Sequence, residues 1–208
     1  MPGWRRPMVD GIVTDAPLPV GSAGRNSTAW FGLLCLIATE GSLFAYLLFS
    51  YAYFGAQNSS DWLPTLHPSF KYGLPGTIVL FSSSGTIWWS ERGMKQGNRS
   101  QHLIGLIATI LLGFAFIVLE LLDWHDKGFS LSSRAYGSFY FTITGFHLLH
   151  VIVGVAVLTA VLGWSLAGYF TERRHMHVTI SGAYWHFVDV VWVFVFSTFF
   201  LAPYVVAS

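Results

Sequence analysis

Long apolar runs separated by short polar breaks extend over most of the chain. They cover approximately residues 29–54, 72–90, 102–124, 136–170 and 179–204. Each run reaches the roughly 20 residues that an α-helix needs to cross the hydrocarbon layer of a membrane. The pattern predicts an all-α, polytopic membrane protein. Its five transmembrane helices would form a bundle over residues 29–204, preceded by an N-terminal arm at 1–28 and followed by a tail at 205–208.

The second run is the least apolar of the five. Small and polar residues lie at its centre, namely Ser82, Ser83, Ser84, Gly85 and Thr86. Apolar side chains alone give helices no reason to associate in lipid, whereas small residues let two helices approach closely. The cluster therefore predicts that the second helix packs closely against a neighbour.

Lysine and arginine are distributed unevenly over the loops, and this predicts the orientation of the bundle. Eight of the eleven lie in the N-terminal arm and in the loops after the second and fourth helices: Arg5, Arg6, Arg25, Arg92, Lys95, Arg99, Arg173 and Arg174. Cytoplasmic loops of membrane proteins carry an excess of these residues. We therefore expect a cytoplasmic N-terminus and a periplasmic C-terminus in the inner membrane of a bacterium.

The composition excludes several other classes of protein. Of the 208 residues, 53% are hydrophobic and 10% are charged, whereas a soluble domain carries about 25% charged residues. The formal net charge of +1 provides no basic face for a nucleic acid. The one cysteine, Cys35, can form neither an internal disulfide nor a cysteine metal cluster.

Ionisable side chains inside the predicted spans are the candidates for function. They are Glu40 in the first span, Glu120 and Asp123 in the third, His147 and His150 in the fourth, and His186 and Asp189 in the fifth. Each costs at least ~2.5 kcal/mol to insert, so such groups normally face protein or water. Positions three apart on a helix project within about 60° of each other. We therefore expect each pair of residues three positions apart on the last two helices, His147 with His150 and His186 with Asp189, to contact one neighbour.

Two interpretations of these residues are open. Histidine is the commonest metal ligand, but a di-iron bundle uses Glu-x-x-His on two helices, and this chain has His147-Leu-Leu-His150 and His186-Phe-Val-Asp189. A membrane oxygenase with a histidine metal site is the alternative from another class. The spacing favours a polar network of His147, His150, His186 and Asp189 that joins the fourth and fifth helices, without a metal or a catalytic residue. A role in proton handling or lipid contact also remains open.

Two sequence strings resemble a known family. The string TGFHLLHVIVG, from Thr144 to Gly154, resembles a helix of subunit III of the haem-copper oxidases, and YWHFVDVVW, from Tyr184 to Trp192, resembles its last helix. The pair Thr39-Glu40 and the segment from Ala135 to Ser138 extend the similarity, which covers roughly residues 29–204. The chain is similar to the short, five-helix bacterial form of the subunit.

The resemblance implies a subunit of an oxidoreductase and translocase complex that carries no redox centre itself. Haems and copper are expected in partner subunits, and subunit I, subunit II and subunit IV are the expected protein partners. Membrane phospholipid is the expected bound lipid. The implied role is to stabilise subunit I of a proton-pumping cytochrome c oxidase and to support its proton uptake. A quinol oxidase subunit and a nitric-oxide-reductase accessory protein are alternatives within the superfamily.

The resemblance also assigns roles to individual residues. Glu40 matches the buried functional glutamate of the family, and we expect it to donate a hydrogen bond within its helix or to the facing fourth helix. The four residues of the predicted polar network match characteristic positions of the last two helices. Glu120 and Asp123 are secondary acids, because the family usually has Gln-x-x-Glu at this place.

Overall fold

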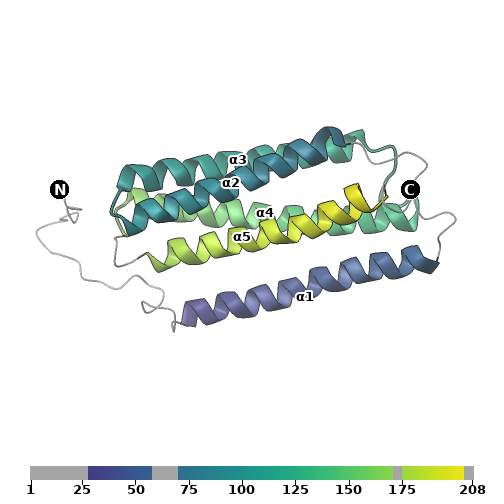
Figure 1. Ribbon diagram of the computed structural model, residues 1–208, viewed down its shortest axis with the longest axis horizontal. Helices are drawn as coiled ribbons and strands as arrows, with labels where there is room; N and C mark the ends of the chain where they lie inside the picture. The colour runs from purple at the N-terminus through teal and green to yellow at the C-terminus, as the bar shows by residue number, and fades with distance from the viewer. Residues whose placement is uncertain (1–27, 58–69, 171–174, 204–208) are drawn as a thin grey trace, which may run out of the picture.

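The structure, a computed structural model, describes residues 28–57, 70–170 and 175–203. Within these ranges five α-helices lie side by side along the long axis of the molecule (Figure 1). They are α1 (Thr28–Gln57), α2 (Phe70–Lys95), α3 (Arg99–Asp126), α4 (Ala135–Leu166) and α5 (Met176–Phe196), and α5 continues into the π-helical turn η1 (Ser197–Leu201). The predicted arm before α1 and the predicted C-terminal tail lie outside the described residues.

Four of the five described helices have the length and composition of membrane spans. Among the described residues, α1, α3, α4 and α5 together with η1 are long and apolar enough to cross a membrane. The least apolar helix, α2, packs among them against α3 and α5. The prediction of an all-α polytopic membrane protein is confirmed, while the orientation of its ends stays a prediction.

A tight turn places α2 and α3 side by side. Gly97 follows α2 with a φ of 72°, a conformation that glycine adopts at little cost. The backbone N–H of Asn98 then donates to the carbonyl of Gly93 at 2.8 Å, as in a glycine-terminated helix end. The Asn98 side chain accepts a hydrogen bond from the backbone of Gln101 and so begins α3.

Small residues let α2 and α3 approach closely. A Cβ atom on Gly105 would lie 2.8 Å from the Cβ of Ser90 and 2.9 Å from the carbonyl oxygen of Thr86. The hydroxyl oxygens of Thr86 and Thr109 are 2.8 Å apart across the same contact. The close packing predicted from the serine-rich centre of α2 is confirmed by these contacts.

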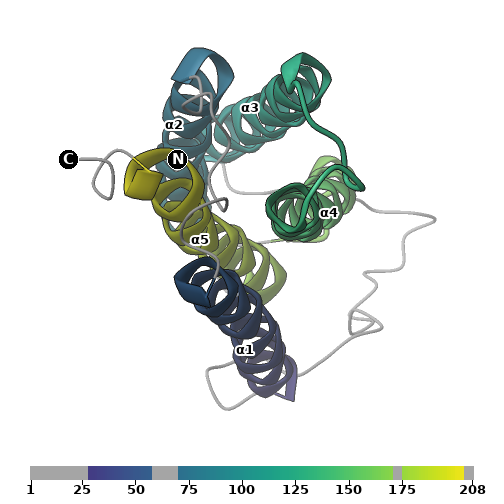
Figure 2. The same cartoon turned by 90° about the vertical axis from the view of Figure 1, so that its right-hand side faces the viewer.

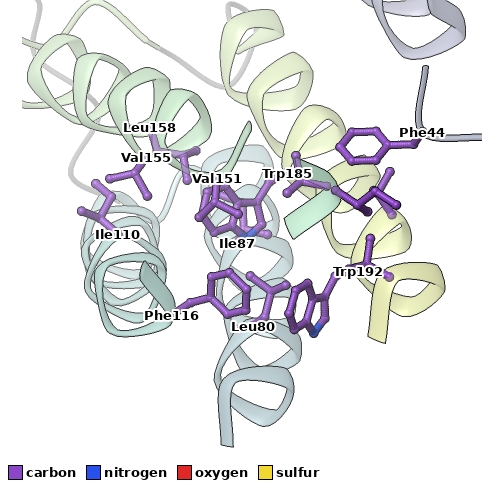
Figure 3. Close-up of a cluster of buried hydrophobic side chains, with 14 of the residues drawn as sticks. Phe44, Leu80, Ile87, Ile110, Phe116, Val151, Val155, Leu158, Trp185 and Trp192 are labelled. Carbon is purple, nitrogen blue, oxygen red and sulfur yellow. The ribbon is translucent and has the colours of Figure 1, made fainter. Parts of the chain in front are cut away.

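The core of the bundle is built around α5. End-on, α5 lies between α1 and α2 (Figure 2). Its Trp185 ring is fully buried among side chains of the other helices (Figure 3). Glycines make room for the ring, because a Cβ on Gly113 of α3 or Gly154 of α4 would lie within 3 Å of it. The indole N–H of Trp185 donates to Ser83 Oγ at 2.9 Å, so this buried ring is also fixed to α2.

Candidate functional site

The predicted polar residues occupy separate contacts between helices. His147 and His150 were expected to share a neighbour, and this expectation is wrong: His147 faces α5, whereas His150 faces α1. His186 and Asp189 do meet one neighbour, which is Ser84 of α2. The predicted network between the fourth and fifth helices is therefore three contacts, which join α4 to α1, α4 to α5, and α5 to α2.

Glu40 and His150 form the contact between α1 and α4. Glu40 Oε2 lies 3.1 Å from His150 Nε2, and the other ring nitrogen lies 2.6 Å from the carbonyl oxygen of Phe146. A carbonyl only accepts, so Nδ1 carries a hydrogen. One further proton then lies between Nε2 and the carboxyl group, held either by the acid or by an imidazolium. Glu40 therefore contacts the fourth helix, as expected, and its partner there is an ionisable ring.

This pair is accessible from outside the bundle, so the expectation that Glu40 is a buried acid is wrong for the chain by itself. The Glu40 side chain is 32% exposed and the His150 side chain is 13% exposed. The ring of Phe44 packs edge-on against the His150 imidazole, with 5.2 Å between the ring centroids. The hydroxyl of Tyr184 donates to the His150 carbonyl at 3.2 Å. The pair can thus hold a proton at the surface between two helices while neighbouring rings keep the imidazole in place.

His147 lies in the centre of the bundle and is fully buried. Its Nε2 is 3.3 Å from the carbonyl oxygen of Val188, so this nitrogen donates. The ring packs on Trp192 and against the edge of Phe116. Its Nδ1 has no hydrogen-bond partner among the described residues. His147 thus holds α4 against α5 through one hydrogen bond and the Trp192 ring, and against α3 through the Phe116 ring.

Ser84 joins His186 and Asp189. Its hydroxyl oxygen lies 2.8 Å from His186 Nδ1 and donates to Asp189 Oδ2. Asp189 is buried, with 4% of its surface exposed, while the His186 side chain is 41% exposed. Sequence reasoning used the serine cluster as a packing signal and missed this bond. The available signal was the spacing of Thr77, Ser84 and Glu91, which are seven residues apart and so share a helix face.

The two secondary acids, Glu120 and Asp123, lie near the C-terminal end of α3 and are both buried. Asp123 accepts a hydrogen bond from the Tyr140 hydroxyl and lies 3.0 Å from Lys127 Nζ. The Lys127 ammonium also lies over the Tyr140 ring, 5.0 Å from its centroid. One carboxyl oxygen of Glu120 has no hydrogen-bond partner in the part of the chain that the structure describes. The positive charge of Lys127 thus lies beside the Asp123 carboxyl group. Sequence reasoning did not identify Lys127 as the partner of Asp123.

A second fully buried histidine among the described residues, His102, was not singled out from the sequence. It is fully buried where α2, α3 and α4 meet. Its two ring nitrogens each lie 2.9 Å from a hydroxyl oxygen, one of Ser90 and the other of Ser165. His102 lies at the start of the third apolar run, and no pattern in the chain indicates that other helices enclose it. Over residues 28–57, 70–170 and 175–203, no three His, Cys, Asp or Glu side chains are placed to hold a metal ion.

Comparison with known proteins places this arrangement in a family. The family model for cytochrome c oxidase subunit III matches residues 26–204, which include all five helices. The chain belongs to the cytochrome c oxidase subunit III family. The resemblance inferred from the strings in α4 and α5 is therefore confirmed, and the helix contacts described above all lie within the matched region.

Three relatives from animals illustrate the similarity. The protein named cytochrome c oxidase subunit 3 from Gallus gallus is 34% identical over 180 residues, which is 82% of this chain and 68% of the relative. That of Gadus morhua is 36% identical with the same coverage, and that of Dugong dugon is 33% identical over 204 residues, 95% of this chain and 77% of the relative. Their names identify these proteins as subunits of an oxidase.

Proposed function

We propose that the chain is the third subunit of a bacterial haem-copper oxidase that takes electrons from cytochrome c. In this proposal haems and copper belong to subunits I and II, and this chain packs against subunit I in the inner membrane. It stabilises subunit I and supports proton uptake during oxygen reduction. The names of the animal relatives support cytochrome c as the donor. The basic residues Arg92, Lys95 and Arg99, gathered around the α2–α3 turn, support a cytoplasmic position for that end.

The observation that carries the proposal is the pair formed by Glu40 and His150. It holds a proton between two ionisable groups, and the Glu40 side chain is 32% exposed where α1 meets α4. A buried acid that only fastened two helices would gain nothing from this exposure. A pair that exchanges its proton with water or with a partner subunit requires it. The exposed apolar side chains of α1, among them Phe31, Tyr46 and Phe49, give the same region a surface for lipid.

Replacing Glu40 by alanine tests this role. Glu40→Ala should leave the initial rate of oxygen consumption close to that of the parent oxidase. It should reduce the number of turnovers that the enzyme completes before it is inactivated. Ser42→Ala is a matched control, because Ser42 is exposed on the same helix and its hydroxyl bonds only to the carbonyl of Ala38 in the described contacts. Loss of the first turnovers in the Glu40 variant would contradict a supporting role.

Purification from the native membrane tests the partners. A tagged chain should carry with it a haem-bearing subunit, and the complex should oxidise reduced cytochrome c with consumption of oxygen. Oxidation of a quinol in place of cytochrome c would overturn the assignment of the donor. A chain that purifies alone with bound metal would overturn the whole proposal in favour of a metal-dependent membrane enzyme.

A further inference from the structure

Three polar residues of α2 form a row against α5. Thr77, Ser84 and Glu91 are seven residues apart and share one face of the helix. Thr77 accepts a hydrogen bond from the indole of Trp192 at 2.9 Å, and Ser84 contacts His186 and Asp189. The Glu91 carboxyl group lies directly on Gly182, where a Cβ atom would collide with it. The row runs from the end of the bundle near Glu91 towards the middle of α5.

The side chains that contact this row are exposed at one end and buried at the other. The His186 side chain is 41% exposed and interacts electrostatically with Glu91. Glu91 in turn lies near Lys95, at 3.7 Å, and interacts with His175. At the closed end, Asp189 is buried, and its Oδ1 has no hydrogen-bond partner among the described residues. His186 is thus the exposed member of its contact with Ser84 and Asp189, and Asp189 is the buried member.

Other helices supply no competing partner to this row in the described contacts. The acid of α1, Glu40, contacts His150, and Gly41 of α1 lies against Phe187 of α5. The histidine of α4, His147, bonds to the carbonyl oxygen of Val188. The charge at His186 is thus set by α2 and by its own helix.

The Ser84 hydroxyl permits two arrangements of hydrogen. It carries one hydrogen and accepts through its lone pairs. In the first arrangement His186 Nδ1–H donates to Ser84, and Ser84 donates to the Asp189 carboxylate. In the second the protonated carboxyl group of Asp189 donates to Ser84, and Ser84 donates to the bare Nδ1 of His186. Direct transfer is excluded, because His186 Nδ1 and Asp189 Oδ2 are 3.9 Å apart, beyond hydrogen-bond distance.

We propose that Ser84 is a proton bridge through which His186 loads one proton onto Asp189. As the N–H bond of His186 breaks, a new O–H bond forms on Ser84, while the original O–H bond of Ser84 breaks and one forms on Asp189. The step starts from a His186 ring protonated on both nitrogens and an Asp189 carboxylate; it ends with a neutral imidazole that keeps its Nε2 hydrogen and a neutral carboxylic acid, so no atom or charge is left over. The three side chains form a proton store whose exposed member is His186. This goes beyond the proposed role of Glu40 and His150, because it places a second, separate proton site between α2 and α5.

Infrared spectroscopy of the full chain in lipid nanodiscs tests the bridge. With ¹³C-labelled aspartate carboxyl groups, lowering the pH should produce a carboxylic C=O band that Asp189→Asn removes. In the parent chain its hydrogen should exchange rapidly after a change to D₂O. Ser84→Ala should slow this exchange by at least about tenfold, as expected when a relay step is removed from the barrier. Ser84→Thr should restore the rate.

Two further variants keep the test decisive. Ser82→Ala is the matched control, because Ser82 is exposed and bonds to the carbonyl of Ile78 on its own helix; it should exchange at the parent rate. If Ser84→Ala fails to fold, His186→Gln carries the test and should show the same slowing. Exchange at the parent rate in the folded variant, or the absence of a protonated Asp189 at every pH in the parent chain, would overturn the proposal. Because no partner subunit is needed, a negative result here is distinct from a failure to assemble with subunit I.

Discussion

α1 and α2 both contact the central helix α5, but they do so in different ways. α2 bonds to α5 through buried side chains, and two of its hydroxyls accept from the indoles of Trp185 and Trp192. α1 remains largely exposed: 11% of its most apolar stretch is buried inside the bundle, against 50% for α5 with η1. Its polar bond goes to His150 of α4. α2 and α5 thus belong to a fixed core, whereas the surface of α1 is available to lipid or another subunit.

The largest expected effect is at the indole in the core. Trp185→Ala should lower the free energy of unfolding by ~3–5 kcal/mol, because it leaves a cavity and removes the bond to Ser83. Phe49→Ala, at a side chain of α1 that is 68% exposed, should change it by less than ~0.5 kcal/mol. Unfolding in mixed micelles titrated with SDS measures both. Equal losses would show that α1 is as much a part of the core as α5.

A smaller effect is expected at the polar contact between α2 and α5. Asp189→Ala removes the acceptor of the Ser84 hydroxyl and should cost ~0.6–2 kcal/mol, the range for hydrogen bonds between helices in membranes. Asp189→Asn keeps an oxygen at this place and should cost less. Unfolding of the two variants and metal analysis of the purified chain check this. Loss of a bound metal in either variant would contradict a purely hydrogen-bonding role.

The smallest effect is expected on the inner face of α1. A Cβ on Gly41 would meet the Phe187 ring at 3.8 Å, which is an ordinary contact. Alanine is also the better helix former by about 1 kcal/mol, so Gly41→Ala should leave thermal stability unchanged or slightly raised. Gly105→Ala is the contrasting variant and should lower it, because the new methyl would lie 3.0 Å or less from the backbone of α2. A comparable loss in both would show that α1 is closely packed after all.

The number and order of the helices could be predicted from the sequence, because a span has to be apolar over most of its length. The close packing of α2 against a neighbouring helix could also be predicted, since small residues let helices approach closely in lipid. These features depend on residues that are near one another in the chain. They require no knowledge of which helices are neighbours.

The partners of the polar residues could not be predicted in this way. His147 and His150 differ by about 60° around α4, and this angle is sufficient for one to meet α5 and the other α1. Periodicity assigns a residue to a face but does not identify the helix opposite. The contact between Ser84 and His186 joins positions 102 residues apart. It follows only from the placement of α5 beside α2, which the sequence of either helix does not specify.

Because α1 packs mainly on α5 and α4, the first of the five helices to be synthesised is among the last to find its partners. α2 and α3 can pair as soon as both have entered the membrane, since a tight turn joins them. The Trp185 ring reaches its place between Gly113 and Gly154 when α5 follows. Synthesis halted before α5 would leave α1 without its main contact and the centre of the bundle unfilled. Insertion of α5 is therefore the step that completes both the assembly of the bundle and its core. Until that step, α1 is surrounded by lipid.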